Sequence, residues 1–184
     1  TFVGVIQTIV IMKQRILYLF ALFFALVGIF ALQKPLFMFY NTTESLSVID
    51  YWNVIRHGLS LDMTTAGYLT VLPLLILIAS TWTKKWALRK WMRPYLILIG
   101  TIMAIIFIVD TALYTFWGFK LDATVFNYLD SPSEAFASVS IGFITARIFG
   151  IAAVAFFFSW IFIHLTPKKL CTCHHRISTT LLLL

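Results

Sequence analysis

Four long apolar runs constrain the fold of this chain more than any other feature. They lie at about residues 16–32, 64–83, 94–117 and 138–165. A helix needs about 20 mostly apolar residues to cross a bilayer, whereas a transmembrane β-strand needs about 10 residues of alternating polarity. Because these runs are continuous, we predict an all-α, polytopic transmembrane helical bundle with four complete spans.

The composition supports a membrane location for the whole chain. Hydrophobic residues make up 61% of its 184 positions and charged residues only 11%, which is too little polar surface for a soluble domain of this size.

The chain divides into two segments. Residues 1–11 are too short to span a membrane and are interpreted as an upstream or interfacial segment. We expect residues 12–184 to form an N-terminal transmembrane domain, in which the last leucines, 181–184, indicate a fifth span beginning near residue 177.

The placement of the basic residues predicts the orientation. Ten of the fourteen Lys and Arg lie in the N-terminal flank, in the hairpin at 82–94 and at 167–176, whereas the two other loops carry Lys34, Arg56 and Lys120. Since Lys and Arg are enriched in cytoplasmic loops, the N-terminus is predicted to be cytoplasmic. No basic stripe accompanies a soluble fold, so a nucleic-acid partner is not expected.

Two similar segments lie sixty positions apart, at 58–69 and 118–129. Both contain Leu-Asp-x-Thr where an apolar run meets polar sequence, and the charge pattern places both outside the cytoplasm. Asp62 and Asp122 are therefore expected first to cap helices, and second to contact lipid headgroups.

The first outer loop is expected to cover residues 33–61, with a short interfacial helix at about 47–59. Arg56 and His57 in this loop, together with Lys120 in the second, are further candidates for headgroup contacts. Pro73 is expected to kink the second span, and Pro94 to open the third at its first turn.

Two charged residues lie within the spans. Asp110 is eight residues before Gly118 and Arg147 is nine residues after Ser138, so both lie about 12–13 Å from the outer boundary at 1.5 Å per residue. Charges at such depth usually face a partner or a water-filled cavity. We expect Asp110 and Arg147 to pair, either to lock two helices together or to leave Arg147 lining an outward cavity where it meets a lipid phosphate.

No catalytic residues and no metal site are predicted within this chain. Cys171, Cys173, His174 and His175 superficially resemble zinc ligands, but structural zinc sites usually leave two to four residues between their cysteines. A chance cluster in a cytoplasmic loop is the preferred interpretation. The sequence also lacks a glycine-rich phosphate cradle and a Ser/His/Asp arrangement.

Three blocks of residues resemble the membrane domain of bacterial lipoteichoic-acid-synthase-like proteins. These are sulfatase-type phosphoglycerol or phosphoethanolamine transferases of the alkaline phosphatase superfamily. The likeness covers most of residues 12–169. The blocks are Arg56-His57-Gly58-Leu59-Ser60-Leu61-Asp62 with Tyr68 and Pro73, Phe116-Trp117-Gly118-Phe119-Lys120-Leu121-Asp122-Ala123-Thr124 with Tyr128-Leu129-Asp130-Ser131-Pro132, and Pro167-Lys168-Lys169.

This resemblance implies a role as the membrane part of a larger enzyme in a bacterial plasma membrane. Family members have five membrane helices followed by an extracytoplasmic catalytic domain with a threonine nucleophile and a divalent metal, typically manganese. They transfer a phospholipid headgroup to an acceptor in the cell envelope. The resemblance therefore implies that this chain anchors a missing C-terminal domain and shapes the approach of its membrane phospholipid.

Two other classes of function remain open from the sequence. One is a small integral membrane transporter or channel that uses Asp110 and Arg147 in its pathway, although inverted-repeat transporters place their repeats on opposite sides of the membrane. The other is a structural scaffold subunit.

Overall fold

The computed structural model describes residues 2–42, 45–82, 88–118 and 140–167, and four helices form nearly all of this part of the chain. They are α1 (Phe2–Asn41), α2 (Val48–Trp82), α3 (Leu88–Trp117) and α5 (Ile141–Leu165). Each is long and apolar enough to cross a membrane. An all-helical chain with four segments able to span a bilayer is thus confirmed for the described residues. The expected spans at 16–32 and 94–117 lie within α1 and α3, and most of the expected spans at 64–83 and 138–165 lies within α2 and α5.

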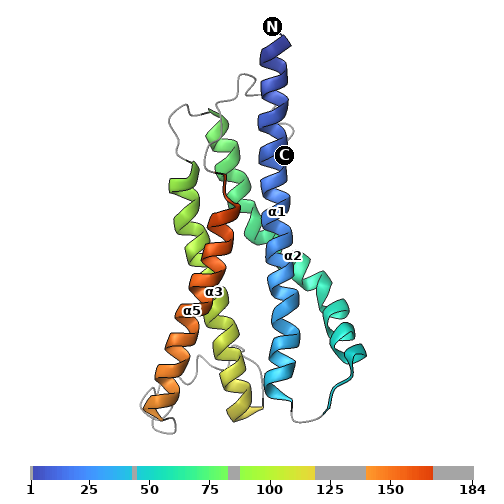
Figure 1. Ribbon diagram of the computed structural model, residues 1–184, viewed down its shortest axis with the longest axis vertical. Coiled ribbons are helices and arrows are strands. Elements are labelled where there is room, and N and C mark those ends of the chain that lie inside the picture. Colours follow the sequence, from blue (N-terminus) through green and yellow to red (C-terminus); the bar gives the residue numbers. More distant parts are fainter. Residues whose placement is uncertain (1, 43–44, 83–87, 119–139, 168–184) are drawn as a thin grey trace.

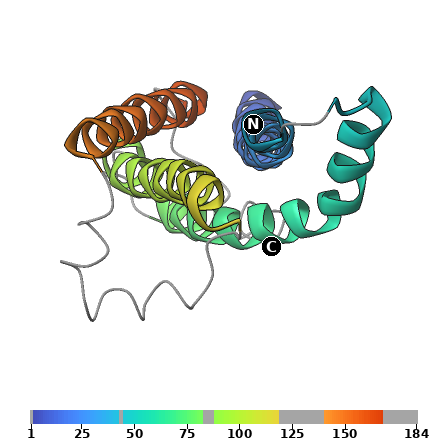
Figure 2. The same ribbon diagram turned by 90° about the horizontal axis from the view of Figure 1, so that it is seen from below.

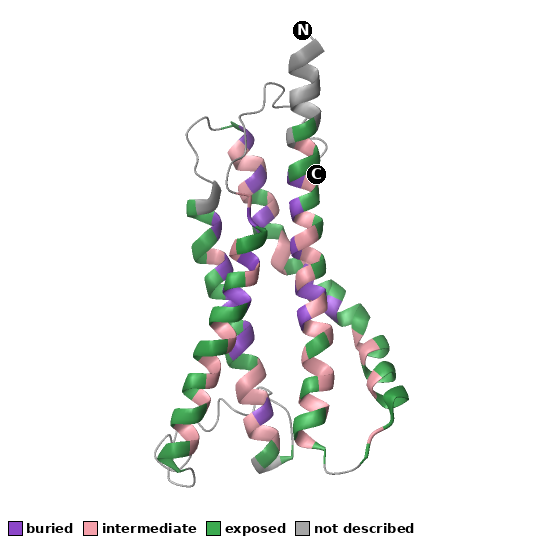
Figure 3. Ribbon diagram, viewed as in Figure 1, coloured by how far each residue is buried: buried purple, intermediate pink, exposed green. Residues whose placement is uncertain are grey.

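The helices run up and down in two closely packed pairs (Figure 1). α1 packs mainly against α2, and α3 packs mainly against α5, while fewer contacts join the two pairs. Residues coloured as buried lie mostly where the helices face one another, and exposed residues are frequent on their outer sides (Figure 3). The largest members of this core are Tyr18, Leu22, Leu26, Ile29, Leu77, Met92, Leu96, Ile99, Met103, Phe158 and Phe162. Large apolar side chains also cover the exposed faces, as a lipid environment requires.

The expected outer loop at 33–61 is wrong, because most of it is helical. α1 continues to Asn41 and α2 already begins at Val48. Ser47 and Asp50 start α2 with a capping box, in which the Ser47 hydroxyl accepts from the Asp50 amide at 3.3 Å and the Ser47 amide donates to the Asp50 carboxylate at 2.9 Å. The expected interfacial helix and the second span therefore form one continuous helix.

The two copies of the sequence repeat occupy different structural positions. The first copy lies inside α2, so the predicted role of Asp62 as a helix cap is wrong. The second copy begins at Gly118, which ends α3 with a left-handed backbone (φ 70°), and its remaining residues lie outside the described part. The Ser47–Asp50 box supplies the start signal of α2 well before Asp62, which leaves Asp62 free of that role.

Pro73 leaves a backbone carbonyl in α2 without its usual partner, and α3 satisfies it. A proline has no N–H to donate to the carbonyl four residues earlier, here that of Leu69. The Tyr95 hydroxyl donates to this oxygen at 2.7 Å. α2 is visibly curved in Figure 2, as expected of a helix with an internal proline. Tyr95 therefore holds α3 against α2 where the proline interrupts the backbone bonds.

Pro94 does not open α3, contrary to expectation. The helix begins six residues earlier, at Leu88, and Pro94 lies within it on an exposed face. α5 begins close to the expected boundary, with Ser140 as its N-cap: the Ser140 hydroxyl accepts from the Phe143 amide at 3.3 Å.

α3 and α5 approach closely at a pair of small residues. A Cβ atom placed on Gly100 would lie 2.8 Å from the Ser159 hydroxyl and 3.1 Å from the Ser159 backbone nitrogen. Small residues at such crossings allow two helix backbones to pack closely. In membranes, van der Waals contact between helices stabilises their association, because the hydrophobic effect does not act between them. This contact explains why α3 and α5 form one of the two tight pairs.

Candidate functional site

The first part of α2 forms an arm that leaves the bundle. We call residues 48–61 the α2 arm; it lies at the same end of the molecule as the end of α1, the end of α3 and the start of α5 (Figures 1 and 2). Its apolar side chains are strongly exposed, with Val48 at 84%, Trp52 at 64% and Leu61 at 71%. An exposed apolar helix surface of this kind is suited to the boundary between acyl chains and headgroups.

One face of the α2 arm is polar. Asp50, Asn53, His57 and Ser60 recur at spacings of three and four residues, so they share a face, and Arg56 lies at its edge. Arg56 and His57 are both exposed. The His57 Nδ1 atom is 2.7 Å from the Asn53 carbonyl, which leaves the other ring nitrogen directed away from the helix backbone. The two predicted headgroup contacts on this arm thus occupy successive helical positions, and both are accessible.

An ion pair joins the base of this arm to α1. The Lys34 ammonium contacts the Asp62 carboxylate, and Asp62 is only 7% exposed. Gly58 makes room for it, since a Cβ atom there would lie 2.6 Å from the Lys34 Nζ atom. A headgroup contact by Asp62 would have to compete with Lys34, and it stays a prediction.

The positions of Lys34 and Asp62 along their helices do not predict that the two residues pair. Lys34 is seven residues before the end of α1, whereas Asp62 is fourteen residues after the start of α2. Depths counted along straight antiparallel helices would place the two residues about 10 Å apart at 1.5 Å per residue. They meet because α2 leaves the bundle at an angle, which the sequence does not specify.

Arg147 is held by aromatic residues at the same end of the molecule. Its Nη2 atom donates to the Tyr40 hydroxyl at 2.6 Å, and its guanidinium lies 4.6 Å from the Phe143 ring centre and 5.3 Å from that of Tyr40. Such cation–π contacts orient the planar group while leaving donors for an anion. Arg147 therefore links α5 to the last turn of α1.

The expected pairing of Arg147 with Asp110 stays a prediction. Asp110 lies half-buried on α3, the helix against which α5 packs.

A polar contact also joins α1 to α3 at the end of the bundle that carries the α2 arm. The Thr115 hydroxyl donates to the Asn41 side-chain oxygen at 3.1 Å. The end of the bundle that holds the candidate site thus has several polar links between helices.

Arg15 lies at the opposite end of the bundle and is buried. From the sequence, it counts only among the basic residues that predict the orientation. Arg15 is 1% exposed, and its Nη1 atom donates to the Leu77 carbonyl of α2 at 3.1 Å. The Tyr18 and Thr166 hydroxyls lie 3.4 Å apart and connect α1 to the end of α5. Positions 15, 18, 22 and 26 share one helix face, so periodicity could have indicated that Arg15 faces the core.

Several predicted residues lie outside the described part of the chain. These are Lys120 and Asp122 in the second outer segment, and Cys171, Cys173, His174 and His175 near the C-terminus. Among the described residues, no three His, Cys, Asp or Glu side chains are grouped closely enough to hold a metal ion.

Comparison with known proteins adds no assignment. The chain matches no protein-family model, and no curated protein or solved structure is significantly similar to it.

Proposed function

We propose that this chain is the membrane-anchor and lipid-approach domain of a bacterial sulfatase-family phosphoglycerol or phosphoethanolamine transferase. Its partners are a membrane phospholipid and a C-terminal extracytoplasmic catalytic domain, which would carry the threonine nucleophile and the manganese ion. The enzyme would act on a polymer or glycolipid of the cell envelope from the plasma membrane. The resemblance of residues 56–62 and 116–124 to that family motivates the proposal.

The α2 arm is the observation that carries this proposal. Its exposed apolar residues, such as Val48 and Trp52, favour insertion among acyl chains, while Arg56 and His57 remain accessible beside them. A helix with one apolar and one polar face lies in the plane of the interface, with its polar side chains at the level of the headgroups. The arm thereby supplies a surface on which a donor lipid can present its phosphate to a domain above the membrane.

The basic side chains at this surface favour a ligand that carries a phosphate. Arg56 offers a planar set of donors that matches phosphate oxygens, and His57 adds a neutral or cationic donor. Arg147 lies at the same end of the bundle, oriented by Tyr40 and Phe143. The ion pair between Lys34 and Asp62 fixes the base of the arm, so that its polar face keeps one direction.

The reading frame beyond Leu184 tests the proposal most directly. We expect it to continue through a fifth apolar span into a large polar domain with a threonine among metal-ligand residues. A stop codon directly after Leu184 would overturn the proposal and leave the transporter and scaffold hypotheses.

The role of the α2 arm is tested in the full-length protein with a fluorescent phosphatidylglycerol or phosphatidylethanolamine donor. Replacing Arg56 and His57 by Gln should raise the KM for the donor lipid while leaving kcat nearly unchanged, since the substitutions remove binding and not chemistry. Lys13→Gln, a cation on α1 at the other end of the bundle, is the control and should change neither constant. Unchanged KM in the Arg56 and His57 variant would contradict the proposed lipid approach.

A further inference from the structure

Two adjoining depressions, one along α3 and one between α3 and α5, form a groove toward the end opposite the α2 arm. The first has a volume of about 430 Å³ and is lined by Lys90, Arg93, Pro94 and Ile97. The second has a volume of about 460 Å³ and is lined by Ile97, Thr101, Ala155, Phe156, Ser159, Trp160, Ile163 and His164. Ile97 belongs to both, so we treat them as one basic groove with a charged end and an apolar end.

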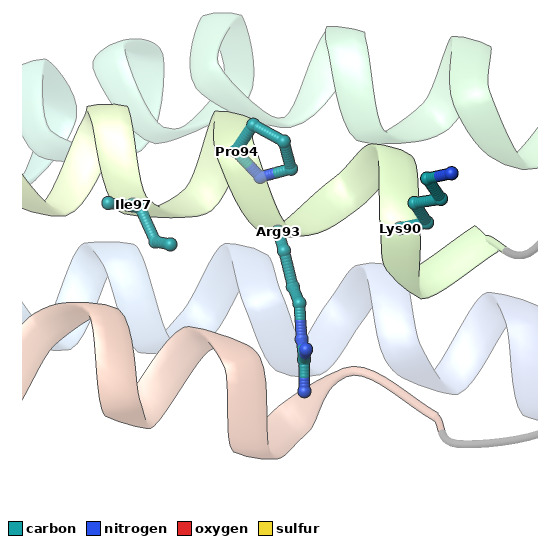
Figure 4. A pocket seen from close by; sticks show the side chains of 4 residues that line it. All are labelled: Lys90, Arg93, Pro94 and Ile97. Atoms are coloured by element: carbon teal, nitrogen blue, oxygen red, sulfur yellow. The ribbon is translucent and has the colours of Figure 1, made fainter.

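The two ends of the basic groove differ in chemistry. Arg93, Ile97 and Thr101 follow one another at spacings of four residues, so they share a face of α3 over about 12 Å. Figure 4 shows the Arg93 side chain extending from α3 toward α5, whereas Lys90 lies nearer the N-terminal end of α3. The groove therefore leads from two cations at the helix end to apolar side chains deeper in the bundle.

The charged end of the groove lacks a neutralising carboxylate within the described residues. Acidic residues of that part of the chain lie elsewhere: Asp50 and Asp62 are in the first half of α2, and Asp110 is seventeen positions beyond Arg93 on α3. Lys90 and Arg93 are both exposed. Their positive charge is thus available to an anion from outside the protein.

Aromatic side chains shape the apolar end. The Trp160 and His164 ring centres lie 5.2 Å apart, one helical turn from each other on α5. Trp160 and Phe156 are 52% and 73% exposed, on a surface that the membrane would cover. An occupant of this end meets mostly apolar side chains, among them Ile97, Ala155 and Phe156.

We infer that the basic groove binds an anionic phospholipid, with its phosphate at Lys90 and Arg93 and an acyl chain along Ile97, Ala155 and Trp160. Basic pockets between transmembrane helices commonly hold anionic headgroups in this way. Charge complementarity selects an anionic lipid over a zwitterionic one, and the apolar continuation selects a lipid over a free phosphate. The site lies at the other end of the bundle from the α2 arm, so this inference does not depend on the proposed enzyme.

Quenching of Trp160 by brominated lipids tests the inference directly. The full chain is reconstituted in phosphatidylcholine nanodiscs containing dibrominated phosphatidylglycerol or dibrominated phosphatidylcholine. The Trp160 signal is the difference between the wild type and Trp160→Phe. We expect half-quenching at a roughly 25-fold lower mole fraction of phosphatidylglycerol, since each of the two cations, Lys90 and Arg93, contributes on the order of a fivefold change near an anionic headgroup. Equal quenching by the two lipids would overturn the inference.

Two pairs of variants test separately the role of the cations at the charged end of the groove and the role of the space at its apolar end. Arg93→Gln should reduce the preference for phosphatidylglycerol about fivefold, whereas Lys13→Gln, a cation on α1 at the same end, should leave it unchanged. Ala155→Phe fills the apolar end and should weaken quenching by both lipids, whereas Ala152→Phe, on an exposed part of α5 outside the groove, should not. Identical behaviour of Arg93→Gln and Lys13→Gln would show that only overall charge matters, and would refute a specific site.

Discussion

At the scale of single residues, the structure shows how polar groups are accommodated in a chain with so few of them. Lys34 and Asp62 neutralise each other at the base of the α2 arm, and Asp62 is almost fully buried there. Removing one partner of a buried pair leaves an uncompensated charge, which costs more than removing both. The fit also depends on Gly58, whose missing side chain leaves room for the Lys34 ammonium.

Replacing Gly58 tests this arrangement against a matched glycine in the same helix. A Cβ atom on Gly67 would meet nothing within 4 Å, so Gly67→Ala should be neutral or stabilise α2 by up to about 1 kcal/mol through helix propensity. Gly58→Ala gains the same propensity, but the end of the Lys34 side chain must move to make room for the new methyl group, so Gly58→Ala should stabilise the protein less than Gly67→Ala does. Denaturation followed by circular dichroism in detergent measures both. Equal effects of the two substitutions would contradict the proposed role of Gly58.

At the scale of helices, two contacts explain how α3 is held between its neighbours. On one side, Tyr95 donates to the Leu69 carbonyl that Pro73 leaves without a backbone donor. On the other side, Gly100 allows close approach to Ser159 of α5. Each contact is local, but each decides where a whole helix lies.

The hydrogen bond of Tyr95 predicts that the destabilisation caused by Tyr95→Phe depends on the presence of Pro73. Tyr95→Phe should destabilise the protein by about 1 kcal/mol, the size typical of hydrogen bonds between transmembrane helices. In a Pro73→Ala background, the restored backbone amide can satisfy the Leu69 carbonyl, so Tyr95→Phe should then cost less. Tyr68→Phe, at an exposed position of α2, is the control, and chemical denaturation in detergent measures all of these variants. An equal cost of Tyr95→Phe in both backgrounds would show that the hydroxyl does not serve this carbonyl.

The Gly100 contact predicts that even one methyl group disrupts the α3–α5 pair. The nearest atoms include the Ser159 backbone nitrogen, which cannot move without shifting α5. Gly100→Ala should therefore cost about 1–3 kcal/mol, as overpacking does in well-packed cores. Gly28→Ala, which meets nothing within 4 Å, should not destabilise the protein. A thermal-melt comparison of the two variants in detergent checks this, and similar melting temperatures would refute the tight contact.

At the scale of the whole molecule, the two helix pairs bring chemically different surfaces to the two ends of the bundle. The α2 arm and Arg147 lie at one end, while Lys90, Arg93 and the buried Arg15 lie at the other. The orientation predicted from the basic hairpin places the first end outside the cell. Both proposals, the lipid approach at the arm and the anionic lipid in the groove, depend on this separation.

Cysteine labelling in intact cells checks the orientation. In a background with Cys171 and Cys173 replaced by Ser, cysteines at Ser60 and Lys120 should both react with a membrane-impermeant maleimide. A cysteine at Lys84, in the basic hairpin, should react only after the cells are opened. Reaction at only one of the two outer positions would contradict a shared outer side for both repeat segments.

Parts of the candidate site could be predicted from the sequence, and parts could not. Arg56 and His57 are candidates from the sequence because they lie in the predicted first outer loop, and in the structure both are exposed on the α2 arm. The extent of α2 was missed, although the Ser47–Asp50 capping box was visible in the sequence. Aromatic and polar residues at 33–61 were interpreted as a loop because they interrupt the apolar run, but a helix at a membrane surface tolerates that composition.

The sequence by itself determined that the described part of the chain forms four helices able to span a membrane. Hydrocarbon offers no partner for backbone polar groups, so long apolar runs have no alternative to helices that satisfy their own hydrogen bonds. Only the tertiary structure decided which polar groups meet: Lys34 with Asp62, Tyr95 with the Leu69 backbone carbonyl, and Arg147 with Tyr40. Those pairings depend on how each helix bends, tilts and rotates, and these quantities arise from packing between helices that hydropathy does not encode.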